Sequence, residues 1–187
     1  MNRVLIVVDY QRDFVDGIIG SEAARAIEPR ICQKIESYRR SGDDVIFTMD
    51  THTPQDMDCR EFSGSRRLHC EDGTEGWQIY GKVAQYLPSA KRLIRKNSYG
   101  SIELADVLRQ EDYDVVELVG VTTHACVLSN AIIAAAAKPY ARILVDPACT
   151  ASSNQLQKQT ALRILESLHI ELCPQDGEGL ALAAGAS

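Results

Sequence analysis

Short apolar runs alternate along this chain with longer segments in which apolar residues recur every three or four positions. The short runs are rich in β-branched residues, a composition typical of buried strands. They predict strands at about Val4–Val8, Asp44–Thr48, Arg92–Arg95, Val115–Val119, Ile143–Val145 and Ile170–Cys173. The segments between them predict helices near Glu22–Ser41, Glu75–Tyr86, Ile102–Gln110, Cys126–Lys138 and Leu156–Leu168.

This order of elements predicts an α/β fold. Continuous apolar strands separated by helices indicate a parallel sheet that is covered on both faces. Right-handed crossovers then give a three-layer α/β/α sandwich, Rossmann-like, with a six-stranded and mostly parallel sheet. The sequence contains no internal repeat and no linker, so residues 1–187 are expected to form one domain. The tail after about Pro174, rich in Gly and Ala, is expected to be a loose end.

Length and charge narrow the classes of partner. A chain of 187 residues is long enough for one sizeable core, and its net charge of −6, without a Lys/Arg cluster, argues against nucleic acid. The first apolar run stops at Asp9 and is too short for a signal peptide, and no later segment approaches a membrane span. We therefore expect a cytoplasmic protein, in which the six cysteines, lacking any CxxC spacing, are free thiols.

Polar or reactive residues follow four of the predicted strands. Asp9 follows the first strand, Asp50 and His52 follow the second, Lys96 follows the third, and Cys126 comes just after the fourth. In open parallel sheets, ligands bind outside the carboxyl ends of the strands. These side chains are therefore expected at one edge of the sheet, where they would form a site.

Cys126 lies where a strand is expected to become a helix. Unpaired N–H groups at a helix N-terminus favour a thiolate and can hold a developing oxyanion. On position alone, a buried structural cysteine is an equally good interpretation. Likewise Asp9 could cap a loop and Lys96 could be a surface charge. Together, however, a lysine near a carboxylate and a thiol would balance the charges and lower the pKa of the thiol.

Three segments carry a resemblance to a known family. They are D-Y-Q-R-D-F-V-D-G (Asp9–Gly17), R-K-N-S-Y-G-S (Arg95–Ser101) and G-V-T-T-H-A-C-V (Gly120–Val127). Their order and spacing resemble the signatures of the isochorismatase-like cysteine hydrolases, and the resemblance extends from about Val4 to Cys173. The fold that this family implies, a Rossmann-like sandwich, agrees with the one predicted from the pattern.

The resemblance implies a catalytic triad of Asp9, Lys96 and Cys126. Cys126 would attack a carbonyl and form a thioester, Asp9 would carry protons and activate water, and Lys96 would hold the pair and stabilise the thiolate. The family also has a non-proline cis peptide before the cysteine, here Val121–Thr122. It would direct the backbone N–H groups of Thr122 and Cys126 into an oxyanion hole. Phe14 matches a residue of the family's substrate pocket.

A second set of residues resembles the metal site of the nicotinamidase branch. D-T-H (Asp50–His52) and L-H-C-E-D-G-T-E-G, which starts at Leu68, imply the ligands Asp50, His52 and His69. Such ligands suit a divalent ion, zinc above all, with manganese and iron as alternatives. Asp58 is a weaker candidate for a fourth ligand, with water in its place otherwise, and Cys70 is weaker still. The competing interpretation is two unrelated loop histidines.

Two departures from the branch concern the pocket. His124 stands where the family often has an acid or Asn, and Ser65–Leu68 lacks the Trp that nicotinamidases often carry before the ligand His69. Trp77 is interpreted as a packing residue of the following helix.

The expected function is a cysteine amidohydrolase, a nicotinamidase that converts nicotinamide and water to nicotinate and ammonia in NAD salvage. The alternatives are a metal-independent hydrolase of another small amide, ureido compound or vinyl ether, and a catalytically silent binding subunit. The expected partners are a small-molecule amide and further copies of the chain in a homo-oligomer, with no nucleic acid and no membrane.

Overall fold

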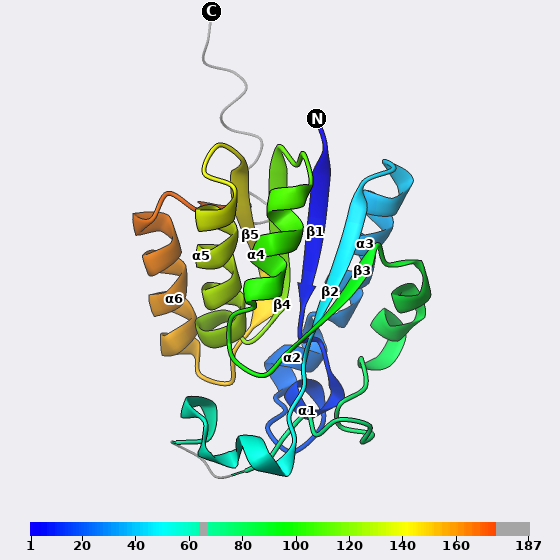
Figure 1. The fold of residues 1–187 in the computed structure, drawn as a ribbon, viewed down its shortest axis with the longest axis vertical. Coiled ribbons are helices and arrows are strands. Elements are labelled where there is room, and N and C mark those ends of the chain that lie inside the picture. The colour runs from blue at the N-terminus through cyan, green and yellow to red at the C-terminus, as the bar shows by residue number, and fades with distance from the viewer. Residues whose placement is uncertain (64–66, 175–187) are drawn as a thin grey trace, which may run out of the picture.

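The alternation of strands and helices builds a parallel sheet between two helical layers (Figure 1). The computed structural model describes residues 1–63 and 67–174, so the predicted loose tail lies outside the described residues. Within these ranges, six parallel strands have the order β3-β2-β1-β4-β5-β6. Their bounds are β1 Arg3–Val8, β2 Asp44–Asp50, β3 Arg92–Lys96, β4 Val115–Val121, β5 Arg142–Ala151 and β6 Glu171–Leu172. The predicted fold class is confirmed.

Side-chain alternation along the central strands divides the core into two halves. In β1, Leu5 and Val7 pack with one buried cluster, whereas Val4, Ile6 and Val8 pack with the other. The first cluster lies under α3 (Glu28–Arg40). The second lies under α4 (Ile102–Gln110), α5 (Leu128–Ala137) and α6 (Gln155–Ser167). Both faces of the strand are buried, which explains why its sequence is continuously apolar.

Two of the predicted helices differ from the structure. The segment expected as one helix over Glu22–Ser41 divides at Ile27 into α2 (Glu22–Ala26) and α3. Pro29 lies in the first turn of α3, where its missing N–H costs no helical hydrogen bond. The helix predicted at Glu75–Tyr86 is wrong: turns are followed by the 3₁₀ helix η3 (Gly81–Ser89). Glycine is a poor helix residue, and Gly76 and Gly81 both fall in this segment.

The strands agree more closely with the prediction, although several are longer. β5 continues to Ala151 past Pro147, and its pairing with β4 shifts register between Leu118 and Gly120. A proline is tolerated at such a bulge because it has no N–H to donate to the ladder. β6 is shorter than predicted and comprises only Glu171–Leu172.

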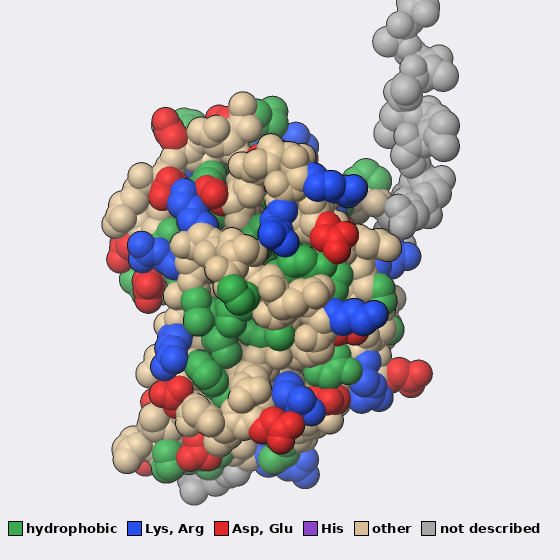
Figure 2. All heavy atoms as spheres, turned by 90° about the vertical axis from the view of Figure 1, so that its right-hand side faces the viewer, with side chains coloured by type: hydrophobic (Ala, Val, Ile, Leu, Met, Phe, Trp, Pro, Cys, Tyr) green, Lys and Arg blue, Asp and Glu red, His purple; other side chains and the backbone are tan. Residues whose placement is uncertain are grey.

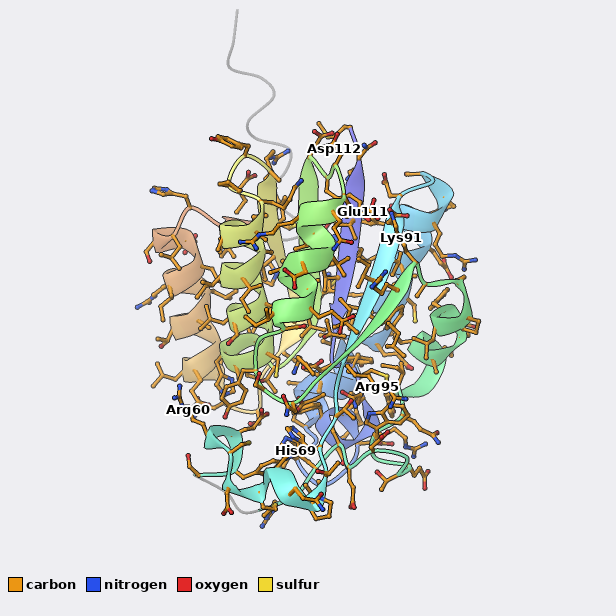
Figure 3. All side chains as sticks on the ribbon, in the orientation of Figure 1. Arg60, His69, Lys91, Arg95, Glu111 and Asp112 are labelled. Carbon is orange, nitrogen blue, oxygen red and sulfur yellow. The ribbon has the colours of Figure 1, made fainter. Side chains whose placement is uncertain are left out.

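The loops at the carboxyl ends of the strands form a cover over the sheet. It contains α1 (Arg12–Val15) and the 3₁₀ helices η1 (Pro54–Asp58) and η2 (Arg60–Phe62). Figure 3 shows His69 at this end of the molecule, and Lys91 and Glu111 at the opposite end, where β3 begins. Reactive side chains at the strand ends are therefore enclosed by residues of this cover.

Edge strand β3 carries exposed charged side chains. It pairs with β2 on one side, and its Arg92 and Arg95 side chains are exposed. Figure 2 shows positive and negative side chains interspersed around a hydrophobic area on the side of the molecule where η3 lies. Charged side chains on an edge strand discourage pairing with another sheet.

No helix in the described part of the chain combines the length and hydropathy that a bilayer crossing requires.

Candidate active site

The turn after β4 brings Cys126 to the carboxyl edge of the sheet. Gly120 ends the regular pairing with β1 at a φ of 113°, and a Cβ on it would lie 2.1 Å from the carbonyl oxygen of Val8. Only glycine fits there. The second peptide bond after Gly120, Val121–Thr122, is cis, as the resemblance implied. The chain then enters a π-helical turn, η4 (Thr123–Val127), which places Cys126 directly before α5.

Asp9, Lys96 and Cys126 meet at this edge although they come from three different strand ends. Lys96 Nζ lies 2.6 Å from Asp9 Oδ2 and 3.7 Å from Cys126 Sγ. Asp9 Oδ1 accepts a hydrogen bond of 2.7 Å from the hydroxyl of Thr48. Asp9 Oδ2, by contrast, contacts the lysine as an ion pair and accepts no hydrogen bond within the described residues. One carboxylate oxygen is thus held in place and the other is free to accept a proton.

Burial and the neighbouring charges set the protonation of this group. All three side chains are buried. Burial raises the pKa of the Cys126 thiol well above its ordinary value, and Lys96 opposes this shift only in part. Lys96 lowers the thiol pKa, as expected, but desolvation outweighs the lysine, so the net shift is upward. Burial also raises the pKa of Asp9, against the influence of Lys96. The resting site favours a thiol, which needs a base before it can attack.

Asp50 joins this group to a second one. Its Oδ1 lies 3.0 Å from Lys96 Nζ, and its Oδ2 lies 2.9 Å from His52 Nε2. Burial would raise the pKa of Asp50, but its contacts with His52, His69 and Lys96 hold it below the usual range. A buried amide, Gln11, fixes the backbone here: it accepts a hydrogen bond from Asp50 N and donates one to Asp50 O, each 2.8 Å long.

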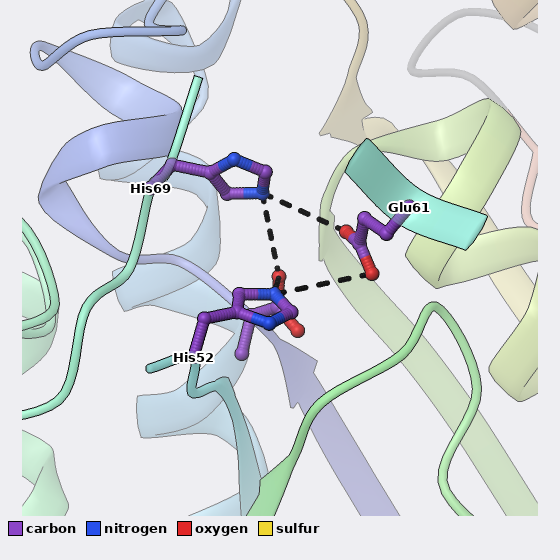
Figure 4. Close-up of side chains that lie close together, drawn as sticks. His52, Glu61 and His69 are labelled. Carbon is purple, nitrogen blue, oxygen red and sulfur yellow. Dashed lines mark hydrogen bonds and ion pairs between the residues drawn. The ribbon is translucent and has the colours of Figure 1, made fainter. Parts of the chain in front are cut away.

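The second group consists of two histidines and two carboxylates. Asp50, His52, Glu61 and His69 each offer one ligand atom, and these atoms all lie within 4.8 Å of one another. Figure 4 shows His69 and His52 directed toward Glu61 from different segments. His69 Nε2 lies 3.6 Å from both Asp50 Oδ2 and Glu61 Oε1, and His52 Nε2 lies 3.9 Å from Glu61 Oε2.

The residues present fit a divalent metal ion. His69 Nδ1 lies 3.0 Å from the carbonyl oxygen of Arg67, which can only accept, so this nitrogen donates, and in the neutral ring Nε2 carries the lone pair that a metal ion would use. A metal-binding histidine is commonly oriented by such a backbone carbonyl. His69 Nε2 and Glu61 Oε2 are buried without a hydrogen-bond partner. Burial lowers the pKa of His69, but the two carboxylates prevail and raise it to about 10, so the cluster favours positive charge.

The sequence did not single out the fourth side chain of this cluster, Glu61. Glu61 takes the place for which Asp58 was suggested, because Asp58 is exposed at the end of η1 whereas η2 turns Glu61 inward. The thiol of Cys70 is buried but does not belong to the group. No spacing signal distinguishes Glu61 from neighbouring acids, since its position depends on how η1 and η2 fold.

Aromatic side chains form one wall of the cluster. Phe14 packs edge-on against His69 at 5.4 Å between ring centroids, and Phe62 lies 4.8 Å from His52 and 5.0 Å from His69. Phe62 was not singled out in the sequence.

Two other residues noted in the sequence lie outside this wall. Trp77 lies in a turn rather than in the predicted helix, and its Nε1 donates to Thr51 Oγ1 at 2.9 Å. His124 is not among the ligands of the cluster, and its Nδ1 contacts Ser152 Oγ at 2.9 Å.

A cavity of about 310 Å³ opens beside the metal cluster. Its lining residues are Cys59, Arg60, Glu61, Asn97, Ser98, Tyr99 and Gly100. They come from η2 with the residue before it and from the segment that follows Lys96, so the cavity shares Glu61 with the cluster. A small ligand that enters here would contact Glu61, a member of the cluster.

A thiol, a carboxylate and a lysine at the carboxyl edge of a parallel sheet define an α/β cysteine hydrolase. Residues 3–175 match the isochorismatase domain, and the chain belongs to the isochorismatase family. A nicotinamidase/pyrazinamidase of Mycobacterium tuberculosis is 28% identical over 190 residues, covering 91% of this chain and 97% of that protein. The predicted family and its nicotinamidase-like branch are thereby confirmed.

Solved structures give the same relationship. A pyrazinamidase/nicotinamidase from Streptococcus mutans superposes with a TM-score of 0.82 at 31% identity, covering 92% of this chain and 100% of that one. A pyrazinamidase of Pyrococcus horikoshii, solved in complex with zinc, has a TM-score of 0.82 at 25% identity, covering 94% and 100% of the two chains.

Proposed function

We propose that this protein is a nicotinamidase, an amidohydrolase that converts nicotinamide and water to nicotinate and ammonia through a thioester on Cys126. The observation that carries the proposal is the joining of two groups by Asp50, which contacts Lys96 with one oxygen and His52 with the other. A nucleophile and a set of metal ligands thus share one buried edge. The nicotinamidase relatives support the substrate class.

In the first half of the reaction, Asp9 Oδ2 takes the proton of the Cys126 thiol, and the sulfur attacks the amide carbon. The carbonyl oxygen becomes an oxyanion, which the backbone N–H groups of Thr122 and Cys126 hold. Asp9 then gives its proton to the leaving nitrogen, the C–N bond breaks, and ammonia departs. Lys96 remains protonated throughout and stabilises the thiolate and the carboxylate in turn.

In the second half, Asp9 takes a proton from water while the water oxygen attacks the thioester carbon. A second oxyanion forms in the same backbone hole. Its collapse breaks the C–S bond, the product leaves as nicotinic acid and ionises to nicotinate in water, and the proton on Asp9 returns to the sulfur. The site is then in its starting state. One carboxylate serves both halves because its Oδ1 is fixed by Thr48 while its Oδ2 stays available.

Asp50, His52, Glu61 and His69 would hold one divalent ion, with zinc as the first choice. When bound, the ion supplies a Lewis-acid site for the ring nitrogen of nicotinamide, so that the substrate is oriented for attack by Cys126. Phe14 and Phe62 pack against the histidines and would bound the ring's site, in place of the Trp that the sequence lacks. The zinc complex of the Pyrococcus relative supports the choice of metal.

An ammonia-release screen tests the proposed function. Purified protein is supplied with nicotinamide, pyrazinamide, benzamide and small ureido compounds, each with and without zinc, manganese or iron. We expect metal-dependent release from the two ring amides whose rings contain nitrogen, and much less from benzamide. Release from a ureido compound that is indifferent to chelators would favour the metal-independent alternative, whereas binding without release would favour a silent subunit.

The wider setting is proposed on the same basis. The chain is taken to be a single hydrolase domain that acts in NAD salvage in the cytoplasm, as a homo-oligomer and without nucleic-acid or membrane partners. The family match supports the single domain, because it spans residues 3–175 without interruption.

A further inference from the structure

A buried amide on α5 hydrogen-bonds both to the backbone of the nucleophile and to the segment that follows Lys96. Asn130 is fully buried, one helical turn beyond the nucleophile. Its Nδ2 donates to the carbonyl oxygen of Cys126 at 2.8 Å and to that of Tyr99 at 3.0 Å. Its Oδ1 accepts from the backbone N–H of Ser101 at 3.0 Å. Both donor hydrogens and one acceptor position are therefore used, and all three partners are backbone atoms.

The sheet order places the two segments that Asn130 joins three strands apart. Lys96 ends edge strand β3, whereas Cys126 follows β4, and β2 and β1 lie between these two strands. Lys96 is paired with Asp50 of β2, so the strand ladder sets its backbone, and the path of the chain after Lys96 can add a second constraint between this end of β3 and Cys126. That path runs to the start of α4 at Ile102, across the strand ends to α5.

The packing of Gly100 shows how closely this path follows α5. A Cβ on Gly100 would lie 2.5 Å from Ile133 Cδ1 and 3.4 Å from Ser129 Cβ. The segment therefore lies directly on the helix, and Asn130 hydrogen-bonds to Tyr99 and Ser101, the residues on either side of Gly100. Because a fully satisfied buried network admits few alternative arrangements, these bonds restrict how far the segment can move relative to Cys126.

We propose that Asn130 is a positioning residue, which fixes the distance between the Lys96 ammonium and the Cys126 thiol by joining the Tyr99–Ser101 backbone to the nucleophile's carbonyl. The proposal rests on the proposed function for its catalytic readout. Asn130 makes no contact with the reacting atoms and acts through the backbone. Its loss is expected to reduce the rate of chemistry and not the binding of nicotinamide.

Two variants of Asn130 separate this role from simple packing. Asn130→Ala removes all three hydrogen bonds. Asn130→Thr can still donate to the carbonyl four residues earlier, that of Cys126, as helical threonines do, but it is too short to reach Tyr99 and Ser101. We expect kcat for nicotinamide to fall about 10- to 100-fold in Asn130→Ala and less in Asn130→Thr, with KM within about twofold in both.

Ser101→Ala is the matched control. The Ser101 hydroxyl caps α4 by accepting from Leu104 N at 3.1 Å, and the substitution removes that cap but keeps the backbone N–H that Asn130 binds. It destabilises the same neighbourhood while leaving the link intact. Its kcat, corrected for the folded fraction, should stay within about twofold of wild type.

The rate at which iodoacetamide alkylates Cys126, followed by peptide mass spectrometry, gives a readout that needs no substrate. We expect this rate to change severalfold in Asn130→Ala and to stay unchanged in Ser101→Ala. If Asn130→Ala does not fold, Asn130→Thr decides. Wild-type kcat and alkylation rate in the folded Asn130 variant would overturn the proposal, as would an equal loss in Ser101→Ala. If wild type releases no ammonia from nicotinamide, the proposed function fails while the alkylation comparison still stands.

Discussion

Two buried ionic networks lie on this sheet, and they differ in how completely their polar atoms are paired. In the network under α3, Lys34 Nζ lies 2.7 Å from both Glu117 Oε1 and Asp146 Oδ2. The second oxygen of Glu117 accepts from the hydroxyl of Tyr38 at 2.6 Å, and that of Asp146 accepts from the backbone N–H of Ala148 at 2.9 Å. All four carboxylate oxygens have partners.

The network at the carboxyl edge is incomplete by comparison. Within the described residues, hydrogen-bond partners are missing for His52 Nδ1, Glu61 Oε2 and His69 Nε2, and Asp9 Oδ2 has only its ion pair with Lys96. An unpaired buried polar atom costs free energy, and such atoms persist where a ligand or a reaction uses them. Burial of charge therefore does not distinguish these two networks, but the completeness of their pairing does. Substitutions in the two networks should have opposite effects on activity and stability.

The largest expected effect is that of Cys126→Ala. Removing the nucleophile should reduce kcat for nicotinamide by about 10⁴-fold or more, because the remaining groups have no sulfur to acylate. Circular dichroism should show a folded protein. Cys149→Ala is the control, since Cys149 is buried beside the α3 network: it should lower Tm without lowering kcat. Near wild-type turnover in Cys126→Ala would remove the nucleophile from the mechanism.

Lys34→Met should have the reverse effect: it should lower stability and leave kcat unchanged. It leaves Asp146 without its cation and Glu117 with only the more distant Arg3, and the loss of one partner from such a network costs about 3 kcal/mol in the free energy of unfolding. Urea unfolding measures this loss, and kcat per folded molecule should be unchanged because the network lies away from the thiol. A large fall in kcat at unchanged stability would show that the α3 network is not purely structural.

A smaller effect is expected for His52→Ala, which removes one ligand of the proposed metal site. Metal analysis should find about one divalent ion per chain in wild type and much less in the variant. KM for nicotinamide should rise about 10- to 100-fold. KM for benzamide, which lacks the ring nitrogen, should change little. Equal effects on both substrates would contradict the orienting role of the site.

The smallest effect concerns acid stability. Burial would raise the pKa of Asp146, but Lys34 prevails and lowers it. A carboxyl group with a lowered folded pKa contributes stability above its unfolded pKa, near 3.9, and loses it as the pH falls through the folded value. Wild type should therefore lose stability below about pH 4 more steeply than Asp146→Asn in urea titrations. Parallel curves for the two proteins would exclude this contribution.

The sequence is sufficient to predict most of the fold. β1 and β4 are buried on both faces, so their apolar runs are unambiguous, and their order with the helices leaves few topologies. The segment at Glu75–Tyr86 was missed because an amphipathic pattern does not report that Gly76 packs against Asp13 and cannot continue a helix. Local pattern predicts elements that pack on the sheet better than those that form its cover.

The site residues that lie at strand ends could be predicted from the sequence. Asp9, Lys96 and Cys126 each lie at or just after the end of a strand, so topology alone brings them to one edge. Glu61 and Asn130 were not predictable: one depends on the path of two short 3₁₀ helices, and the other is a polar residue within an apolar helix. Nor does the sequence reveal that burial raises the thiol pKa despite Lys96.

The role of Asp9 can be measured by intact-mass analysis of protein quenched during nicotinamide turnover, in wild type and in Asp9→Asn. The amide introduced by this substitution would retain the size of the side chain but could not take the thiol proton. We predict a nicotinoyl adduct on Cys126 in wild type and none in Asp9→Asn at the same times. Rapid accumulation of that adduct in Asp9→Asn would contradict the assignment of Asp9 as the base that activates Cys126.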